Sequence, residues 1–209
     1  MRTDSPDTKK GQSQPSTILN HKRQPYPITV TIAIVVPHAK EPEGDPTAVL
    51  FADYMEAALV NRDVEFYTIM GDKSKTMIDL STHNARGTSY NSELSSALKN
   101  SILMVELHSH DEDSADDYGE FDFIIEEFPE FSEENLSEEL SNSLQEFGDA
   151  NVENADASNR YASTLSTLIF GKPAIIFSVN ENSKEKFMGS SESLVEFLVD
   201  YAARRKSSA

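Results

Sequence analysis

Short runs of apolar and β-branched residues recur along this chain, and more polar segments separate them. The runs lie at residues 28–36, 64–70, 102–107, 121–125 and 173–179. Runs of this kind are typical of strands that are covered on both faces of a sheet. They therefore predict a sheet buried in the middle of the fold.

Segments with helical spacing of apolar residues lie between or after these runs. They cover residues 47–61, 89–100, 132–147, 160–170 and 190–206. Asp45 followed by Pro46 is a typical helix start, because aspartate caps backbone N–H groups and proline suits the first helical position. Strands that alternate with helices favour an α/β fold, with a mainly parallel or mixed central sheet and helices on both faces. We expect a single domain over residues 27–206.

The first 26 residues are polar and rich in Lys, Ser, Gln and Pro, which predicts a disordered arm. They lack the apolar core of a signal peptide. No apolar stretch approaches the roughly 20 residues of a membrane helix. We therefore expect no membrane partner and an intracellular protein, either cytoplasmic or packaged in a particle.

The charge of the chain is strongly negative and unevenly placed. The net charge is -18, which excludes a general nucleic-acid binder, because phosphate contacts need clustered Lys and Arg. No Lys or Arg occurs between Lys99 and Arg160, yet this interval holds about half of the 36 acidic residues. We interpret residues 111–157 as an acidic insertion. It is either a solvated surface or a docking face for a basic protein partner.

Two histidines follow apolar runs and are candidates for metal binding. His38 follows the run at 28–36, with Glu41 three residues later, and His108 follows the run at 102–107. Parallel strands bring their carboxyl ends to one edge of a sheet, so these side chains can meet there. The chain has no cysteine, so a metal needs histidine and carboxylate ligands. Surface-loop roles for these residues are the alternative.

Other residues near His108 are weaker candidates for a role in metal binding. Glu106 lies two residues before His108, so both side chains point to one face if the segment is a strand. Glu106 is then either a partner that orients the histidine or an alternative ligand to Glu41. His110 and Asp111 are interpreted as loop residues that lie near enough to bind or orient a ligand.

Three segments resemble, in order, motifs of the zinc carboxypeptidase superfamily, including its N-formylglutamate amidohydrolase and poly-γ-glutamate hydrolase relatives. They are Pro37-His38-Ala39-Lys40-Glu41, the segment 79–86 and Glu106-Leu107-His108-Ser109. The resemblance implies a Zn²⁺ ion held by His38, Glu41 and His108. It also implies that Arg86, together with Asn84, binds an anionic substrate.

The pattern of that superfamily places a catalytic Glu on or near the last strand, and this chain departs from it. Ser178 occupies the expected position, and Glu181 lies three residues later. Glu181 is therefore the predicted replacement for the general base. Removal of such a base typically costs about 10²–10⁴-fold in rate.

The resemblance predicts a zinc-dependent amidohydrolase or carboxypeptidase-like hydrolase that cleaves an amide bond near a carboxylate in a small anionic amide or peptide. The alternative is a catalytically degenerate member, a pseudoenzyme, that acts as a binding or particle-associated interaction module. A third interpretation is a flavodoxin-like binding domain in which the histidines are incidental. The sequence contains no Walker glycine loop, no Gly-x-Gly-x-x-Gly and no Gly-x-Ser-x-Gly elbow.

Overall fold

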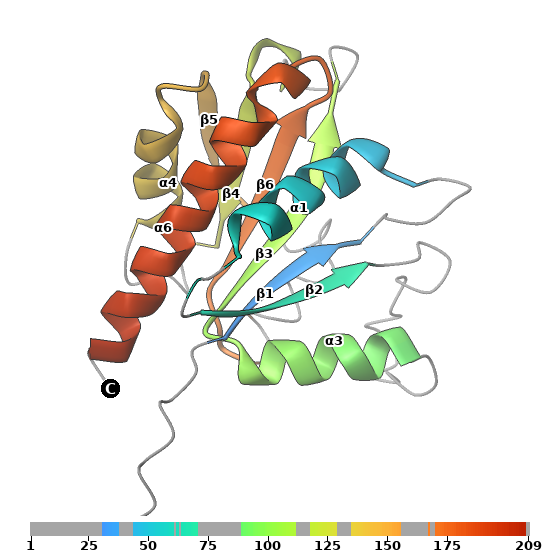
Figure 1. Cartoon of the computed structure of the whole chain (residues 1–209), viewed down its shortest axis with the longest axis vertical. Coiled ribbons are helices and arrows are strands. Elements are labelled where there is room, and N and C mark those ends of the chain that lie inside the picture. Colours follow the sequence, from blue (N-terminus) through green and yellow to red (C-terminus); the bar gives the residue numbers. More distant parts are fainter. Residues whose placement is uncertain are drawn as a thin grey trace, which may run out of the picture.

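The computed structural model describes residues 31–37, 44–60, 62, 64–70, 89–111, 118–128, 135–155, 167 and 170–207. Within these residues the chain forms one α/β domain around a six-stranded sheet (Figure 1). The single-domain fold with a mixed, mainly parallel sheet that the sequence predicts is therefore confirmed.

The sheet has the strand order β2-β1-β3-β6-β4-β5. Its strands are β1 (Thr31–Val36), β2 (Glu65–Met70), β3 (Leu103–His110), β4 (Phe123–Glu127), β5 (Ala150–Asn154) and β6 (Ala174–Asn180). Neighbouring strands are parallel except β4 and β6, which are antiparallel. The carboxyl ends of β1, β3 and β6 consequently lie at one edge of the sheet, whereas β4 and β5 end at the opposite edge.

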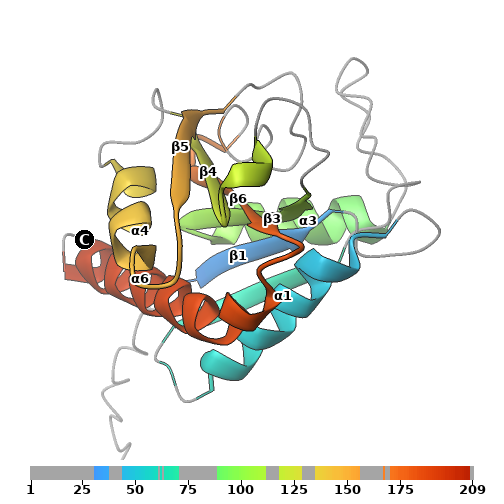
Figure 2. The ribbon, with the colours of Figure 1, turned by 90° about the horizontal axis from the view of Figure 1, so that it is seen from above.

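Helices cover both faces of the sheet (Figures 1 and 2). One face carries α1 (Pro46–Ala58), α4 (Leu136–Leu144) and α6 (Phe187–Ser207), and the other carries α3 (Ser89–Asn100). Two short 3₁₀ helices, η2 (Tyr118–Glu120) and η5 (Lys184–Lys186), lie in the connections. No helix in the described part of the chain is long and apolar enough to cross a membrane.

The strand side chains alternate between two apolar layers, as the two-residue period of a strand requires. Beneath α1 and α6, the ring of Phe177 packs against those of Phe51 and Phe123 at centroid distances of 5.5 and 5.7 Å. The layer under α3 is smaller, and there Leu94 and Leu98 pack on the sheet. Strands covered on both sides explain the continuous apolar runs in the sequence.

Most elements lie where the sequence predicts them. The α3 helix has the predicted bounds, and Asp45 caps α1 by accepting a hydrogen bond from the Ala48 N–H at 2.8 Å. The α6 helix begins at Phe187, before the predicted start at Ser190 or Ser191. Residues 111–157, interpreted as an acidic insertion, contain β4, α4 and β5, so described parts of this segment extend the sheet.

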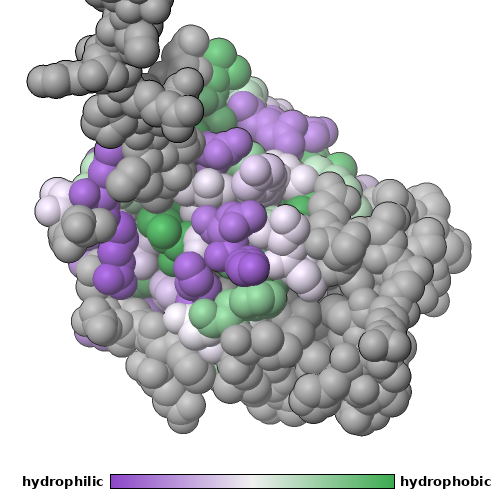
Figure 3. All heavy atoms as spheres, turned by 90° about the horizontal axis from the view of Figure 1, so that it is seen from below, coloured by the Kyte–Doolittle hydropathy of each residue, from purple (hydrophilic) through white to green (hydrophobic). Residues whose placement is uncertain are grey.

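One face of the molecule, seen from below, is mainly hydrophilic in its described part. The view from below in Figure 3 shows hydrophilic residues gathered at its centre, with apolar residues in small patches between them. Large apolar side chains that are exposed among the described residues are Leu50, Tyr54, Val60, Tyr67 and Met188. They come from three separate elements and one turn, so they do not mark a single apolar docking surface.

Candidate functional site

The candidate site lies at the edge of the sheet where β1, β3 and β6 end. Parallel pairing sets Val35 beside Glu106 and His108 beside Ser178. Residues in register on neighbouring strands point to the same face of a sheet. Glu106, His108 and Ser178 therefore share the face that α3 covers.

His108 and Glu106 form a hydrogen-bonded pair on this face. The distance from His108 Nε2 to Glu106 Oε1 is 2.9 Å. Glu106 is only 2% exposed, and the His108 side chain is 12% exposed. A ring nitrogen held by a buried carboxylate fixes the orientation of the imidazole, and this is the usual environment of a metal-binding histidine. The same-face arrangement predicted from the spacing of Glu106 and His108 is confirmed.

Ser178 lies directly beside His108 on β6 and is 6% exposed. This is the position at which the resemblance leads us to expect a carboxylate. A serine hydroxyl is too weakly basic to act as a general base at neutral pH. The described part of this face therefore has no base next to His108 on β6.

Asp45 joins the start of α1 to the end of β3. Its Oδ2 accepts a hydrogen bond from the Ser109 N–H at 2.8 Å, and its Oδ1 contacts the Ser109 Oγ at 2.8 Å. The same carboxylate caps α1 through Ala48. The chain between Pro37 and Asp45 thus begins at the end of β1 and finishes beside Ser109, the neighbour of His108.

Glu181 is held on the other side of β3. Its backbone N–H donates to the His110 carbonyl at 2.9 Å, and its Oε1 lies 3.0 Å from the Ser109 Oγ. Ser109 points to the opposite face from His108, because neighbouring side chains alternate along a strand. The structure therefore brings Glu181 to Ser109, which Asp45 also contacts, and the described contacts of Glu181 do not include His108.

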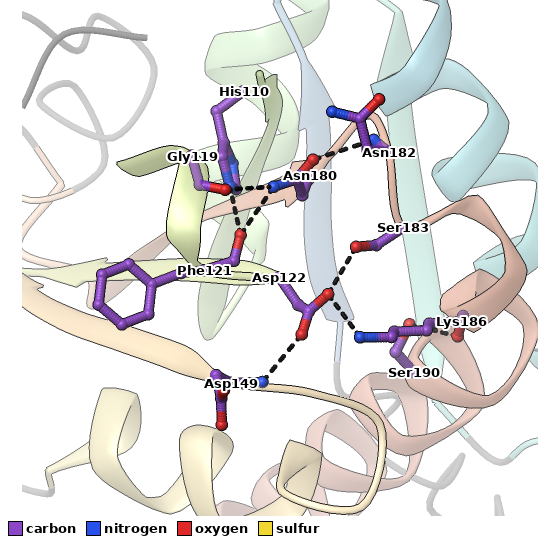
Figure 4. A network of polar contacts seen from close by, with 10 residues as sticks. All are labelled: His110, Gly119, Phe121, Asp122, Asp149, Asn180, Asn182, Ser183, Lys186 and Ser190. Carbon is purple, nitrogen blue, oxygen red and sulfur yellow. Dashed lines mark hydrogen bonds and ion pairs between the residues drawn. The ribbon is translucent and has the colours of Figure 1, made fainter. Parts of the chain in front are cut away.

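His110 and Asn180 fasten the turn at 118–121 to this edge (Figure 4). His110 Nε2 lies 3.0 Å from the Phe121 carbonyl oxygen, so this nitrogen carries the proton and donates. The Asn180 amide donates to the carbonyls of Gly119 and Phe121 at 3.2 and 3.0 Å. His110, predicted as a loop residue, is instead the last residue of β3 and is buried.

Burial lowers the pKa of His110 below its ordinary value, because the imidazolium form would lose hydration. The bond to Phe121 and the negative charges of Asp111, Asp122 and Glu181 oppose this effect without overcoming it. His110 Nδ1 is buried and has no hydrogen-bond partner among the described residues. His110 therefore favours the neutral form in the folded protein.

Asp122 links the start of β4 to the start of α6 (Figure 4). Its carboxylate accepts hydrogen bonds from Ser183 Oγ at 2.5 Å, Lys186 Nζ at 2.6 Å and the Asp149 N–H at 3.0 Å. Burial alone would raise the pKa of Asp122, but these bonds together outweigh burial and lower it. The cluster supports the turn behind the candidate site.

The other predicted site residues, namely His38, Glu41, Asn84 and Arg86, lie outside the described residues. No three His, Asp or Glu side chains come together as a metal site within the described ranges. The donor types still suit zinc, since two imidazoles and a carboxylate are among its usual ligands. Because Nε2 of His108 is bonded to Glu106, His108 would bind a metal through Nδ1.

The sequence interpretation missed one buried carboxylate on the same face. Ile176 pairs with Glu106 on one side and with Glu126 on the other, so the two carboxylates flank β6. Glu126 is 8% exposed. The predicted strand stopped at residue 125, and so no signal marked Glu126 as buried.

No protein-family model and no curated protein matches the sequence. Solved structures of amidases and peptidases do share its fold. N-acetylmuramoyl-L-alanine amidase AmiC2 of Nostoc punctiforme aligns with a TM-score of 0.55 and 15% identity over 82% of this chain and 96% of the amidase chain. A metallo-carboxypeptidase from Burkholderia cenocepacia aligns with a TM-score of 0.51 and 10% identity over 83% of this chain and 58% of that chain. At these identities the likeness establishes the fold alone.

Proposed function

We propose that this chain is a zinc-dependent hydrolase that cleaves an amide bond near a carboxylate. The observation that carries the proposal is the buried pair of Glu106 and His108 at the carboxyl end of β3, with an Nε2 to Oε1 distance of 2.9 Å. The fold is one that amidases and a metallo-carboxypeptidase also use. The pair therefore supports a ligand role for His108.

The two other proposed ligands are His38 and Glu41. The chain that carries them starts after β1, which pairs with β3, and leads to Asp45, which is bonded to Ser109. Both ends of this segment are thus attached near His108. When bound, zinc would lower the pKa of a water molecule and polarise the scissile carbonyl.

The remaining roles belong to side chains that bind the substrate or move a proton. Arg86 would bind the substrate carboxylate through two parallel hydrogen bonds, and Asn84 would donate to the carbonyl oxygen. Glu181 would accept a proton from water and return it to the leaving amine. Its contact with Ser109 lies on the opposite face from His108, so Glu181 must leave Ser109 to serve this purpose.

Metal content tests the proposal directly. The full chain, purified without added metal, is expected to contain about one zinc per molecule, and His108→Ala and His38→Ala are expected to lose it. His21→Ala is the matched control, because it removes a histidine that has no proposed role. Wild-type protein without stoichiometric zinc, or equal zinc in all four proteins, would refute the proposal.

Activity is tested with N-acyl amino acids, including N-acetylmuramoyl-L-alanine, and with peptides that have a free carboxyl end. We expect cleavage by the zinc-loaded chain. The Glu181→Gln variant should lose about 10²–10⁴-fold in rate if Glu181 is the base. Asp45→Asn, which changes the other carboxylate that contacts Ser109, shows how much of the loss comes from disturbing that cluster.

A degenerate enzyme that only binds its ligand is the second candidate, and Ser178 favours it. Ser178 stands beside His108 where the resemblance leads us to expect a carboxylate. In this case zinc is bound, no substrate in the panel is cleaved, and Glu181→Gln changes nothing. A Ser178→Glu variant would then place a carboxylate next to His108, and a gain of hydrolysis in this variant would identify Ser178 as the cause of inactivity.

A further inference from the structure

A hollow of about 530 Å³ lies at the carboxyl ends of β4 and β5, next to the first turn of α4. Three acidic residues, Glu127, Glu138 and Glu153, are among those that line it, together with Asn135 and Asn154. The side chain of Glu153 points to the other face of the sheet, because Glu153 pairs with Glu126 and not with Glu127. The described lining of the hollow contains no basic side chain. The volume is in the range of pockets that bind small molecules or side chains, but the lining is far more polar and more acidic.

This acidic hollow is separate from the candidate zinc site. Because β4 runs antiparallel to β6, Glu127 pairs with Ile175 at the start of β6. His108 pairs with Ser178, three residues further along β6. The hollow therefore opens at the opposite edge of the sheet, and its role does not depend on the proposed hydrolysis.

Glu127 is the buried member of the hollow and is 6% exposed. Its Oε2 accepts a hydrogen bond from the Ser137 N–H at 2.8 Å. Its Oε1 is buried and has no hydrogen-bond partner within the described part of the chain. A buried carboxylate oxygen without a donor is unfavourable, and a ligand that brings a donor would remove this cost.

Asn135 supplies a second polar group to the hollow. It occupies the N-cap of α4, but its side chain makes no capping hydrogen bond. Glu127 instead bonds the Ser137 N–H in the first turn. The Asn135 carboxamide at the rim of the hollow is therefore not required to cap the helix, and it can accept a hydrogen bond from a ligand.

The ligand that fits these groups is an organic cation. The hollow belongs to the interval from Lys99 to Arg160, which contains no other Lys or Arg. Its described carboxylates do not converge closely enough to form a metal site. An ammonium or guanidinium group, in contrast, carries several donors and can reach separate carboxylates on a flexible stem.

We propose that this acidic hollow binds a Lys or Arg side chain of a basic partner protein. Glu127 and Asn135 would bind the cationic group, and Glu138, which is exposed at the start of α4, would attract it from solvent. The acidic segment would then bind its partner at one defined position, and not through charge spread over its whole surface.

The test uses the full chain and a labelled peptide of alternating lysine and glycine with blocked ends, followed by fluorescence anisotropy. The salt concentration is about 150 mM, where long-range attraction between exposed charges is largely screened. A Glu127→Gln/Glu138→Gln double variant is expected to weaken binding by about tenfold or more. The control, Glu146→Gln/Glu192→Gln, removes the same charge from exposed positions elsewhere and should change the affinity by less than about twofold.

Three results would overturn the proposal. The first is no binding by the wild-type chain, and the second is equal weakening in the two double variants, which would indicate diffuse attraction. The third is binding of spermidine as tight as that of the peptide with the same loss in the hollow variant, which would identify a polyamine site. Thermal unfolding and zinc content, measured on each variant, separate these outcomes from misfolding and from failure of the proposed hydrolase activity.

Discussion

At the scale of single residues, the proposed role of Glu106, which is to orient His108, can be tested by one substitution. It is almost fully buried and contacts His108 Nε2 at 2.9 Å. If His108 binds zinc, Glu106→Gln should weaken zinc binding about 10–100-fold, because the partner that orients the ligand loses its charge. Competition with a chelator measures this affinity.

Glu126→Gln is the matched control for that substitution. Glu126 is also a buried carboxylate on the α3 face, and it lies on the far side of β6 from Glu106. Its substitution should leave zinc affinity within about twofold of the wild-type value, since β6 lies between Glu126 and the strand that carries Glu106 and His108. Equal weakening in both variants would mean that the effect comes from general disturbance of the sheet.

Acid should destabilise the protein in two steps that belong to His110 and Asp122. The folded-state pKa of His110 is lowered from 6.5, so the unfolded chain binds this proton more readily. The free energy of unfolding should therefore fall as the pH drops below about 6.5 and continue to fall until the lowered folded pKa is passed. Asp122 has a pKa lowered from 3.8, so its stabilising contribution is present above that pH and is lost below it.

Urea unfolding at a series of pH values measures both steps. The His110→Gln variant retains an amide that can donate to the Phe121 carbonyl but does not titrate, so its stability should change less between pH 7 and 5 than that of the wild type. His21→Gln should show the wild-type profile. A wild-type profile in His110→Gln would show that another group is responsible for the step.

The site residues divide into those that a strand pattern can reveal and those that it cannot. The spacing of Glu106 and His108 suffices to place both on one face, because only the period of a strand is involved. The contact of Glu181 with Ser109 depends on how the chain turns after β6, and no local pattern reports that turn. Asp45 also accepts a hydrogen bond from Ser109, which lies 64 residues later in the sequence. The helix-capping motif at Asp45 does not predict this second contact.

At the scale of elements, Asp45 connects a helix start to a strand end. Its carboxylate accepts from the Ala48 N–H and bonds both the N–H and the hydroxyl of Ser109. Asp45→Ala removes a helix cap and charged tertiary hydrogen bonds together, so it should lower the free energy of unfolding by about 2–4 kcal/mol. Chemical denaturation measures the loss.

Asp53→Ala serves as the control, because Asp53 is exposed within the same helix. It should change stability by less than about 0.5 kcal/mol. An Asp45→Ala variant as stable as this control would mean that the bonds to Ser109 contribute nothing to the fold. Zinc content of Asp45→Ala then reports independently whether the start of α1 positions the chain that carries His38.

The elements found correctly from sequence are those with strong apolar patterns or clear caps. The β5 strand was not predicted, because its sequence, Ala-Asn-Val-Glu-Asn, has a single large apolar residue and half-buried or exposed positions. The start of α6 was placed too late because serine is a frequent N-cap. Ser190 and Ser191 instead lie inside the helix, where their hydroxyls donate to the carbonyls of Lys186 and Met188.

At the scale of the whole molecule, the order of strands is the feature that the sequence did not provide. Alternation of strands and helices predicts a mainly parallel sheet, and four of the six described strands, namely β1, β2, β3 and β6, run in one direction. The other two strands, β4 and β5, are parallel to each other, and β4 is antiparallel to β6. The sheet thus consists of a four-strand parallel part and a two-strand part that runs the other way.

The direction of the two-strand part decides which edge of the sheet carries which site. The candidate zinc site lies where β1, β3 and β6 end, and the acidic hollow lies where β4 and β5 end. No local sequence pattern reports whether two strands pair parallel or antiparallel, because the pattern reflects burial and not direction. The separation of the two sites therefore became visible only in the folded chain.

The position of β6 also has a consequence for how the protein is made. The β6 strand is the last of the described strands in sequence, yet it lies between β3 and β4 and pairs with both. Until residues 174–180 leave the ribosome, β3 and β4 each present an unpaired edge, and unpaired edges invite aggregation. A fragment that ends at Phe170 should therefore show no cooperative urea transition and should scatter light at concentrations where the full chain stays clear. A cooperative transition in this fragment would contradict the expectation, which is that the sheet closes only after synthesis of its central strand.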